Sequence, residues 1–121
     1  MWIESNVNPF KNNVGDCVVR AISAVTGKSW HKVYGELVVL GCNMADMPSS
    51  NRVWGEYLRR IGFERRRLSV PMTVSEFCNY NKQGTYLLAL RGHVVAVIDG
   101  NYYDTWDSGN NEVLFVWQHV E

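Results

Sequence analysis

The sequence has no excess of charge of either sign. Its 121 residues include 12 lysines and arginines and 12 aspartates and glutamates, so the formal net charge is zero. Proteins that bind nucleic acids or anionic membranes usually carry a broad basic surface. We therefore expect neither a nucleic acid nor a membrane as a partner, and nothing in the sequence indicates an oligomeric state.

The sequence also lacks a long hydrophobic segment. Apolar runs such as Leu37–Leu40 are far shorter than the ~20 residues that a membrane-spanning helix needs. The first six residues have no basic start and no apolar core, so they do not resemble a signal peptide. We expect a cytoplasmic protein. Its hydrophobic content of 46% is typical of a globular protein, here a single domain spanning residues 1–121.

Cysteine is scarce, and its pattern excludes two common roles. The three cysteines are Cys17, Cys42 and Cys78, and no two of them form a Cys-x-x-Cys pair of the kind that binds metals. Their number is odd, and we expect no disulfide framework in a cytoplasmic chain. At least one thiol should therefore be free, and the question is which cysteine carries chemistry.

Four helices are expected in the first two thirds of the chain. Residues 1–14 are rich in asparagine and should be irregular. Each expected helix has a residue that can cap its start, and three of them are followed by a glycine. They are Cys17–Thr26, between Asp16 and Gly27; Trp30–Leu40, between Ser29 and Gly41; about Asn51–Ile61, ended by Gly62; and a short helix from the capping box Thr73–Glu76 to about Tyr80.

The chain becomes rich in β-branched and aromatic residues after Gly84. Asp99-Gly100 separates two such segments and is a strong signal of a two-residue hairpin. Helices followed by an antiparallel sheet constitute an α+β fold, in which Arg65-Arg66-Arg67 would protect an edge strand. The expected strands are Phe63–Val70, Thr85–Leu90, His93–Ile98, Asn101–Trp106 and Glu112–His119.

Cys17 is the strongest candidate for a nucleophile. It would be the first residue of its helix, where unpaired amides and the helix dipole lower the pKa of a thiol. Cys42 follows a glycine, and Cys78 lies inside a short amphipathic helix. The backbone N–H groups around Cys17 could also stabilise an oxyanion.

A thiolate nucleophile needs a base, and the base needs an orienting partner. His93 begins a strand, and a hairpin at Asp99-Gly100 would place Asp104 diagonally beside it on the same face. A bulge or a longer loop would bring Asp107 opposite His93 instead. We prefer Asp104 and keep Asp107 as the second choice.

Three segments resemble motifs of the papain-like cysteine peptidases. They are Gly15-Asp16-Cys17 at the start of an apolar helix, His93-Val94-Val95-Ala96-Val97, and Asp104-Thr105-Trp106, which is similar to the family's Asn-Ser-Trp. The resemblance implies a papain-like fold in which Cys17 is the nucleophile, His93 the base, Asp104 the orienting residue and Trp106 a shield over the pair. The chain length is similar to that of minimal bacterial and phage members such as bacteriocin-leader peptidases.

The sequence departs from the papain-like pattern at one position. The family usually has an oxyanion-binding glutamine six residues before the cysteine, where this chain has Lys11; the amides of Asn12 and Asn13 are the substitutes we consider. Gly15-Asp16-Cys17 and the Arg-Ala pair at 20–21 also resemble the signature of ovarian-tumour-type deubiquitinases. This chain is shorter than that fold, and its histidine begins a strand where theirs comes near the end of the domain.

The expected activity is that of a cysteine hydrolase, either a peptidase or an isopeptidase or amidase. A Cys-His-Asp triad would act on a peptide or protein through an acyl-enzyme, with no metal and no organic cofactor. An acyl or amide transferase on the same scaffold would use the same first step. The third hypothesis is a non-catalytic papain-like module that binds peptides, and an unreactive Cys17 would favour it.

Overall fold

The computed structural model describes residues 1–120, which form four helices and six strands. The fold is α+β, as the sequence predicts. The elements are β1 (Trp2–Glu4), α1 (Cys17–Thr26), α2 (Trp30–Met44), α3 (Asn51–Arg60), β2 (Phe63–Arg66), α4 (Val74–Tyr80), β3 (Thr85–Leu90), β4 (His93–Ile98), β5 (Asn101–Asp104) and β6 (Phe115–His119).

The strands form one mixed sheet in the order β1-β5-β4-β3-β6-β2. The purely antiparallel sheet expected from the sequence is wrong at one edge, because β1 pairs in parallel with β5. This strand lies within residues 1–14, which we expected to be irregular. Its three residues are too few to show an alternating pattern, and its pairing depends on β5, about 100 residues later.

The last strand does not continue the meander of β3, β4 and β5. β6 instead pairs with β3 and with β2, so the segment between β5 and β6 crosses to the other side of the sheet's centre. The expected strand Glu112–His119 begins only at Phe115. The residues before it contact the start of α4, where Thr73 bridges to Glu112 and the backbone N–H of Val74 donates to Asn111.

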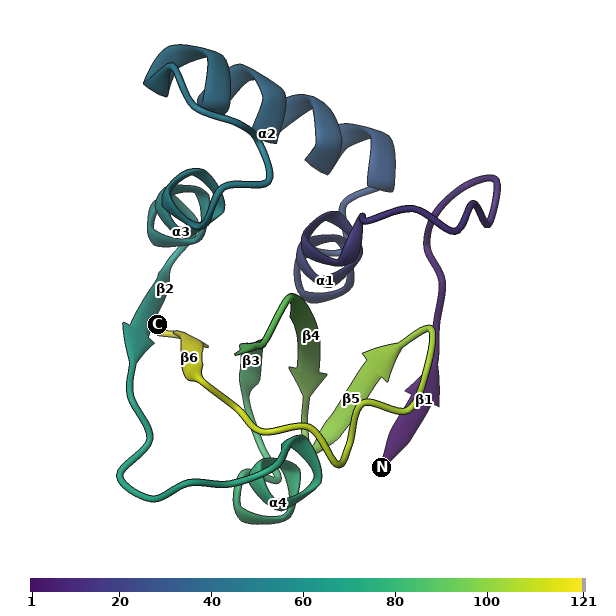
Figure 1. Cartoon of the computed structure of the whole chain (residues 1–121), viewed down its shortest axis with the longest axis vertical. Helices are drawn as coiled ribbons and strands as arrows, with labels where there is room; N and C mark the ends of the chain where they lie inside the picture. Colours follow the sequence, from purple (N-terminus) through teal and green to yellow (C-terminus); the bar gives the residue numbers. More distant parts are fainter. Residues whose placement is uncertain (121) are drawn as a thin grey trace.

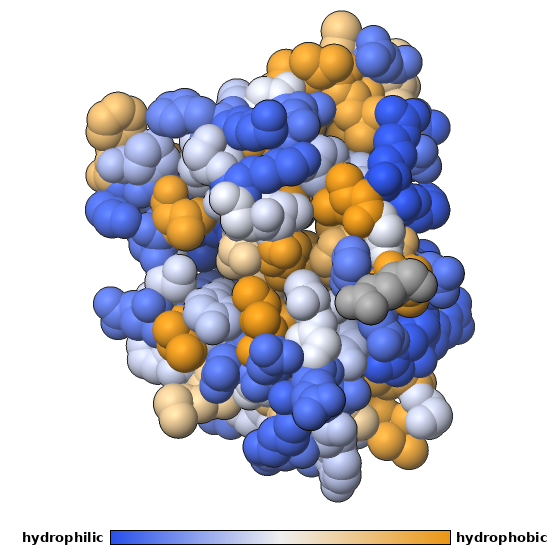
Figure 2. Space-filling view, turned by 180° about the vertical axis from the view of Figure 1, so that it is seen from behind, coloured by the Kyte–Doolittle hydropathy of each residue, from blue (hydrophilic) through white to orange (hydrophobic). Residues whose placement is uncertain are grey.

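Two apolar clusters lie on opposite faces of the sheet. Figure 1 shows α1, α2 and α3 on one side and α4 on the other. The first cluster includes Ile22, Leu37 and Trp54 from the three helices together with Trp117 from β6. The second packs Phe77 of α4 against the sheet. Seen from behind, the surface is mostly polar, with apolar side chains in separate small patches (Figure 2).

Several expected ends of elements are corrected by the structure. Helix α2 passes through Gly41 and ends at Met44. Gly41 does not end the helix but lets the backbone of Asp46 come close, since a Cβ there would lie 2.8 Å from the carbonyl oxygen of Asp46. The strand expected to reach Val70 ends at Arg66, and the strand expected to reach Trp106 ends at Asp104.

The local signals around the hairpin and the short helix are confirmed. Ile98 pairs with Asn101, and both Asp99 and Gly100 have positive φ angles of 49° and 80°, the left-handed conformation of a type I′ turn. Thr73 and Glu76 form the reciprocal capping box at the start of α4. The hairpin register fixes which side chains of β5 lie beside the start of β4.

Candidate active site

Cys17 is the first residue of α1 and is partly buried. The first helical hydrogen bond runs from the N–H of Arg20 to the carbonyl of Asp16, so the N–H groups of Cys17, Val18 and Val19 precede it. Asp16 stands at the N-cap position, but its side chain makes no capping bond. The expected cap is therefore wrong, because the carboxylate is engaged by other side chains.

The surroundings of Cys17 favour its thiolate. Burial by itself raises the pKa of this thiol, but hydrogen bonds from His93 and from the backbone of Val94, with the charges of His93 and Arg20, bring it below the ordinary value. Burial raises the pKa of Cys78, which is enclosed in the second apolar cluster. Cys42 is exposed on α2. Of the three cysteines, only Cys17 combines partial burial with a cationic partner.

His93 lies at the start of β4 and contacts both Cys17 and Asp104. Its Nε2 is 2.6 Å from Oδ2 of Asp104, which leaves Nδ1 as the ring nitrogen available to the thiol. Burial lowers the pKa of His93, but the hydrogen bonds to Asp104 and Cys17 and their charges raise it to about 9. The imidazole is therefore held as an imidazolium at neutral pH.

Asp104 ends β5 and is almost fully enclosed, with 1% of its surface exposed. Besides His93, it accepts hydrogen bonds from the Ser108 hydroxyl at 2.8 Å, the Thr105 N–H at 2.8 Å and the Arg20 guanidinium at 3.3 Å. Burial raises the pKa of this carboxyl, but the bonds from His93 and Ser108 lower it below its ordinary value. The carboxylate is thus held ionised and fixed in orientation.

Asp107, our second choice for the orienting residue, does not contact His93. Its carboxylate accepts hydrogen bonds from the Tyr102 hydroxyl and the N–H of Gly109. The reason is the regular hairpin register, which keeps Asp104 on the face of His93 and leaves Asp107 in the turn after β5. The diagonal position derived from the sequence is the one in which Asp104 lies.

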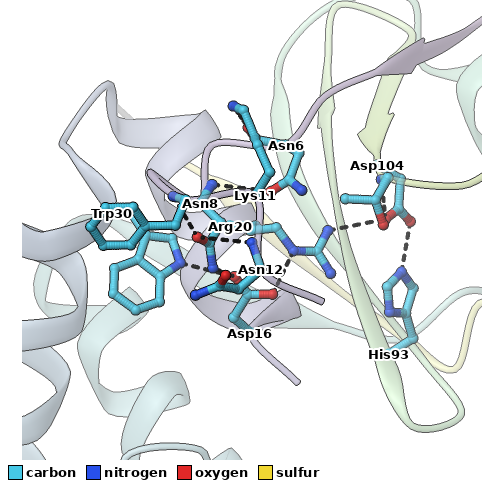
Figure 3. A network of polar contacts seen from close by, with 11 residues as sticks. Asn6, Asn8, Lys11, Asn12, Asp16, Arg20, Trp30, His93 and Asp104 are labelled. Atoms are coloured by element: carbon cyan, nitrogen blue, oxygen red, sulfur yellow. Dashed lines mark hydrogen bonds and ion pairs between the residues drawn. The ribbon is translucent and has the colours of Figure 1, made fainter. Parts of the chain in front are cut away.

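A buried chain of polar side chains continues from Asp104 toward the N-terminal loop (Figure 3). Arg20 bridges Asp104 to Asp16, with its Nε 2.8 Å from the Asp16 carboxylate. Asp16 also accepts from Asn8 at 3.1 Å and from the Trp30 indole at 2.9 Å. Our sequence reasoning missed these roles and that of Ser108, although the four-residue spacing of Asp16 and Arg20 was a usable sign.

Trp106 lies against the histidine, as the resemblance implies for a shielding residue. The centroids of the two rings are 4.9 Å apart with an angle of 39° between their planes, and 43% of Trp106 is exposed. The indole therefore covers one side of the imidazole from solvent.

The asparagines considered for the oxyanion site lie elsewhere. Asn12 and Asn13 are exposed, and neither lines the cavity that contains Cys17. The backbone N–H of Asn12 donates to the side chain of Asn8, and the ammonium of Lys11 donates to the carbonyl of Asn6. Lys11, directly before them, has a left-handed backbone with φ 56°. The N–H groups at the start of α1 remain as candidate donors.

Cys17 and His93 line one cavity of about 780 Å³. Most of its wall is apolar and comes from α1, α2, α3 and the residues around the β3–β4 turn. The larger side chains in this wall are Trp30, Tyr34, Leu37, Trp54, Leu114 and Phe115.

Within residues 1–120, no helix combines the length and the apolar character needed to cross a bilayer. In the same part of the chain, no three His, Cys, Asp or Glu side chains are grouped to hold a metal ion. Comparison with family models, with curated proteins and with solved structures finds no match.

Proposed function

We propose that this chain is a cysteine hydrolase of papain-like type that cleaves an amide bond in a peptide or protein. The observation that carries the proposal is the position of His93 between a partly buried thiol and a buried carboxylate, with Nε2 2.6 Å from Asp104. A catalytic thiolate requires a base within contact and a third group that orients the base. Cys17 and His93 line a cavity large enough for a segment of substrate, and Asp104 is buried against His93.

The geometry supports a two-step reaction. The Cys17 thiolate attacks the carbonyl carbon, and the imidazolium of His93 gives its proton to the departing amine as the C–N bond breaks. Water then attacks the thioester, His93 accepts the water's proton, and the C–S bond breaks to release a carboxylic acid and the original thiolate. N–H groups at the start of α1 would stabilise the oxyanion in both steps.

The first test is alkylation of the native protein by iodoacetamide across a pH series, read by mass spectrometry for each cysteine. Cys17 is expected to react at least ~10-fold faster than a thiol of ordinary pKa at pH 6, because a lowered pKa leaves more thiolate there. His93→Ala should remove this advantage and shift the reaction of Cys17 to alkaline pH.

Cys42 is the internal control, since it is exposed and belongs to the same molecule. Its alkylation should be the same in the parent protein and in His93→Ala. Equal behaviour of Cys17 and Cys42, or a Cys17 that keeps its reactivity in His93→Ala, would contradict the proposed pair and favour a non-catalytic peptide-binding role.

A further inference from the structure

A line of paired residues connects the candidate active site to the far edge of the sheet. Val94 of β4 pairs with Ala89 of β3, and Ala89 pairs with Phe115 of β6. These three side chains belong to the apolar cluster on the face covered by α1, α2 and α3. Since Arg66 of β2 pairs with Val116, the next residue, Arg67, comes beside Phe115. The cavity of Cys17 thus lies over a surface that leads to β2.

Arg65 and Arg67 border a second hollow of about 330 Å³. Leu114 and Phe115 line both this hollow and the cavity of Cys17, so the two are adjacent and share these residues as a wall. The guanidinium of Arg65 lies 4.1 Å from the centroid of the Phe115 ring, which fixes it above that shared wall. Arg67 directly follows the last residue of β2 and lines the same hollow as Arg65.

Both guanidiniums are available to a ligand. Arg65 and Arg67 are exposed, and within residues 1–120 neither forms an ion pair. Glu112 is the acidic side chain that shares the hollow, while Glu64 alternates to the opposite face of the strand. With two cations and one carboxylate, the hollow beside β2 carries a net positive charge.

We propose that the substrate is a polypeptide with an acidic side chain that binds Arg65 and Arg67, about four residues from the bond that is cleaved. Adjacent strands are ~4.8 Å apart, so the three steps from β4 to β2 span ~14 Å, the length of about four extended residues at ~3.3 Å each. The apolar wall between the two ends suits a peptide's side chains better than a nucleic acid backbone. This inference rests on the proposed hydrolase function.

The test uses short peptides that alkylate Cys17 and therefore requires no known substrate. One series carries a bromoacetyl group at the amino end and the other a chloromethyl ketone at the carboxyl end, which covers both chain directions. The fourth residue from the reactive group is Asp, Asn or Lys. In the series whose chain direction matches that of the bound substrate, the Asp peptide is expected to alkylate Cys17 ~10-fold faster than the Asn peptide, and the Lys peptide should be the slowest. Added salt should reduce the difference between the Asp and Asn rates.

The variant Arg65→Gln/Arg67→Gln should bring the Asp and Asn rates together while leaving iodoacetamide alkylation of Cys17 unchanged. Arg52→Gln/Arg60→Gln, which removes two exposed charges from α3, is the matched control and should retain the preference. Thermal unfolding checks that both variants are folded.

The outcomes separate the two proposals. If iodoacetamide reacts selectively with Cys17 but Asp, Asn and Lys peptides react alike, the acidic-substrate proposal fails and the hydrolase proposal stands. If Cys17 is inert to iodoacetamide, both fail. A short oligothymidylate that slows the Asp peptide through Arg65 and Arg67 at lower concentration than a non-reactive Asp peptide would reassign the two arginines to nucleic acid.

Discussion

Replacing Asp104 by asparagine is expected to lower the pKa of His93 from about 9 toward its ordinary value of 6.5. Burial of the imidazole favours its neutral form, and the Asp104 carboxylate at 2.6 Å is the strongest of the contacts that oppose this. An amide in its place can still occupy the space but carries no charge. At pH 8 the variant would hold most of its His93 neutral, whereas the parent holds it as imidazolium.

Long-range nitrogen–proton NMR spectra of the histidine rings, recorded from pH 5 to pH 10, would measure this change. His31 and His119 serve as references in the same spectra because neither contacts Asp104. Loss of the imidazolium should also slow the alkylation of Cys17 at pH 8, where His93 of the variant is mostly neutral, because the thiolate loses its cationic partner.

Asp107→Asn is the matched control for Asp104→Asn. Asp107 lies three residues further on and contacts Tyr102 and Gly109 instead of His93. The pKa of His93 should remain near 9 in this variant. If the pKa of His93 fell equally in Asp104→Asn and Asp107→Asn, the bond between Asp104 and His93 would not be the cause of the raised pKa.

Replacing Arg20 by methionine is expected to reduce the free energy of unfolding by about 3–5 kcal/mol. Asp16 and Asp104 have side-chain exposures of 6% and 1%, and both are bound to the same guanidinium. The substitution would leave Asp16 with only the neutral donors Asn8 and Trp30, and Asp104 with His93 as its remaining cationic partner, so the remaining donors compensate only part of the cost. Methionine keeps the length and the helix propensity of the residue, so the loss would report the charge.

Arg60→Met is the comparison for this prediction. Arg60 and Glu56 have the same four-residue helical spacing as Arg20 and Asp16 and a similar distance, 2.9 Å against 2.8 Å, but the Arg60 side chain is 63% exposed. Removing this exposed pair should cost at most ~1 kcal/mol. Urea unfolding of the three proteins measures both values, and losses of similar size would contradict the special role of the buried bridge.

Much of the geometry of the candidate site could be predicted because it depends on local structure. Asp99-Gly100 specifies a tight turn, the turn sets the register of β4 and β5, and the register brings Asp104 beside His93. The Cys17 helix likewise follows from local spacing and its terminal Gly27, which adopts a left-handed conformation with φ 74°. These features need only the residues within one hairpin or one helix.

The sequence by itself therefore determined the α+β class, the helix that begins at Cys17 and the hairpin that joins His93 to Asp104. Only the tertiary structure decided the parallel pairing of β1 with β5, the position of β6 next to β3, and the contact of Arg20 with Asp104. Arg20 and Asp104 are separated by 84 residues. Such contacts depend on how whole elements pack, and no local propensity or spacing along the chain encodes them.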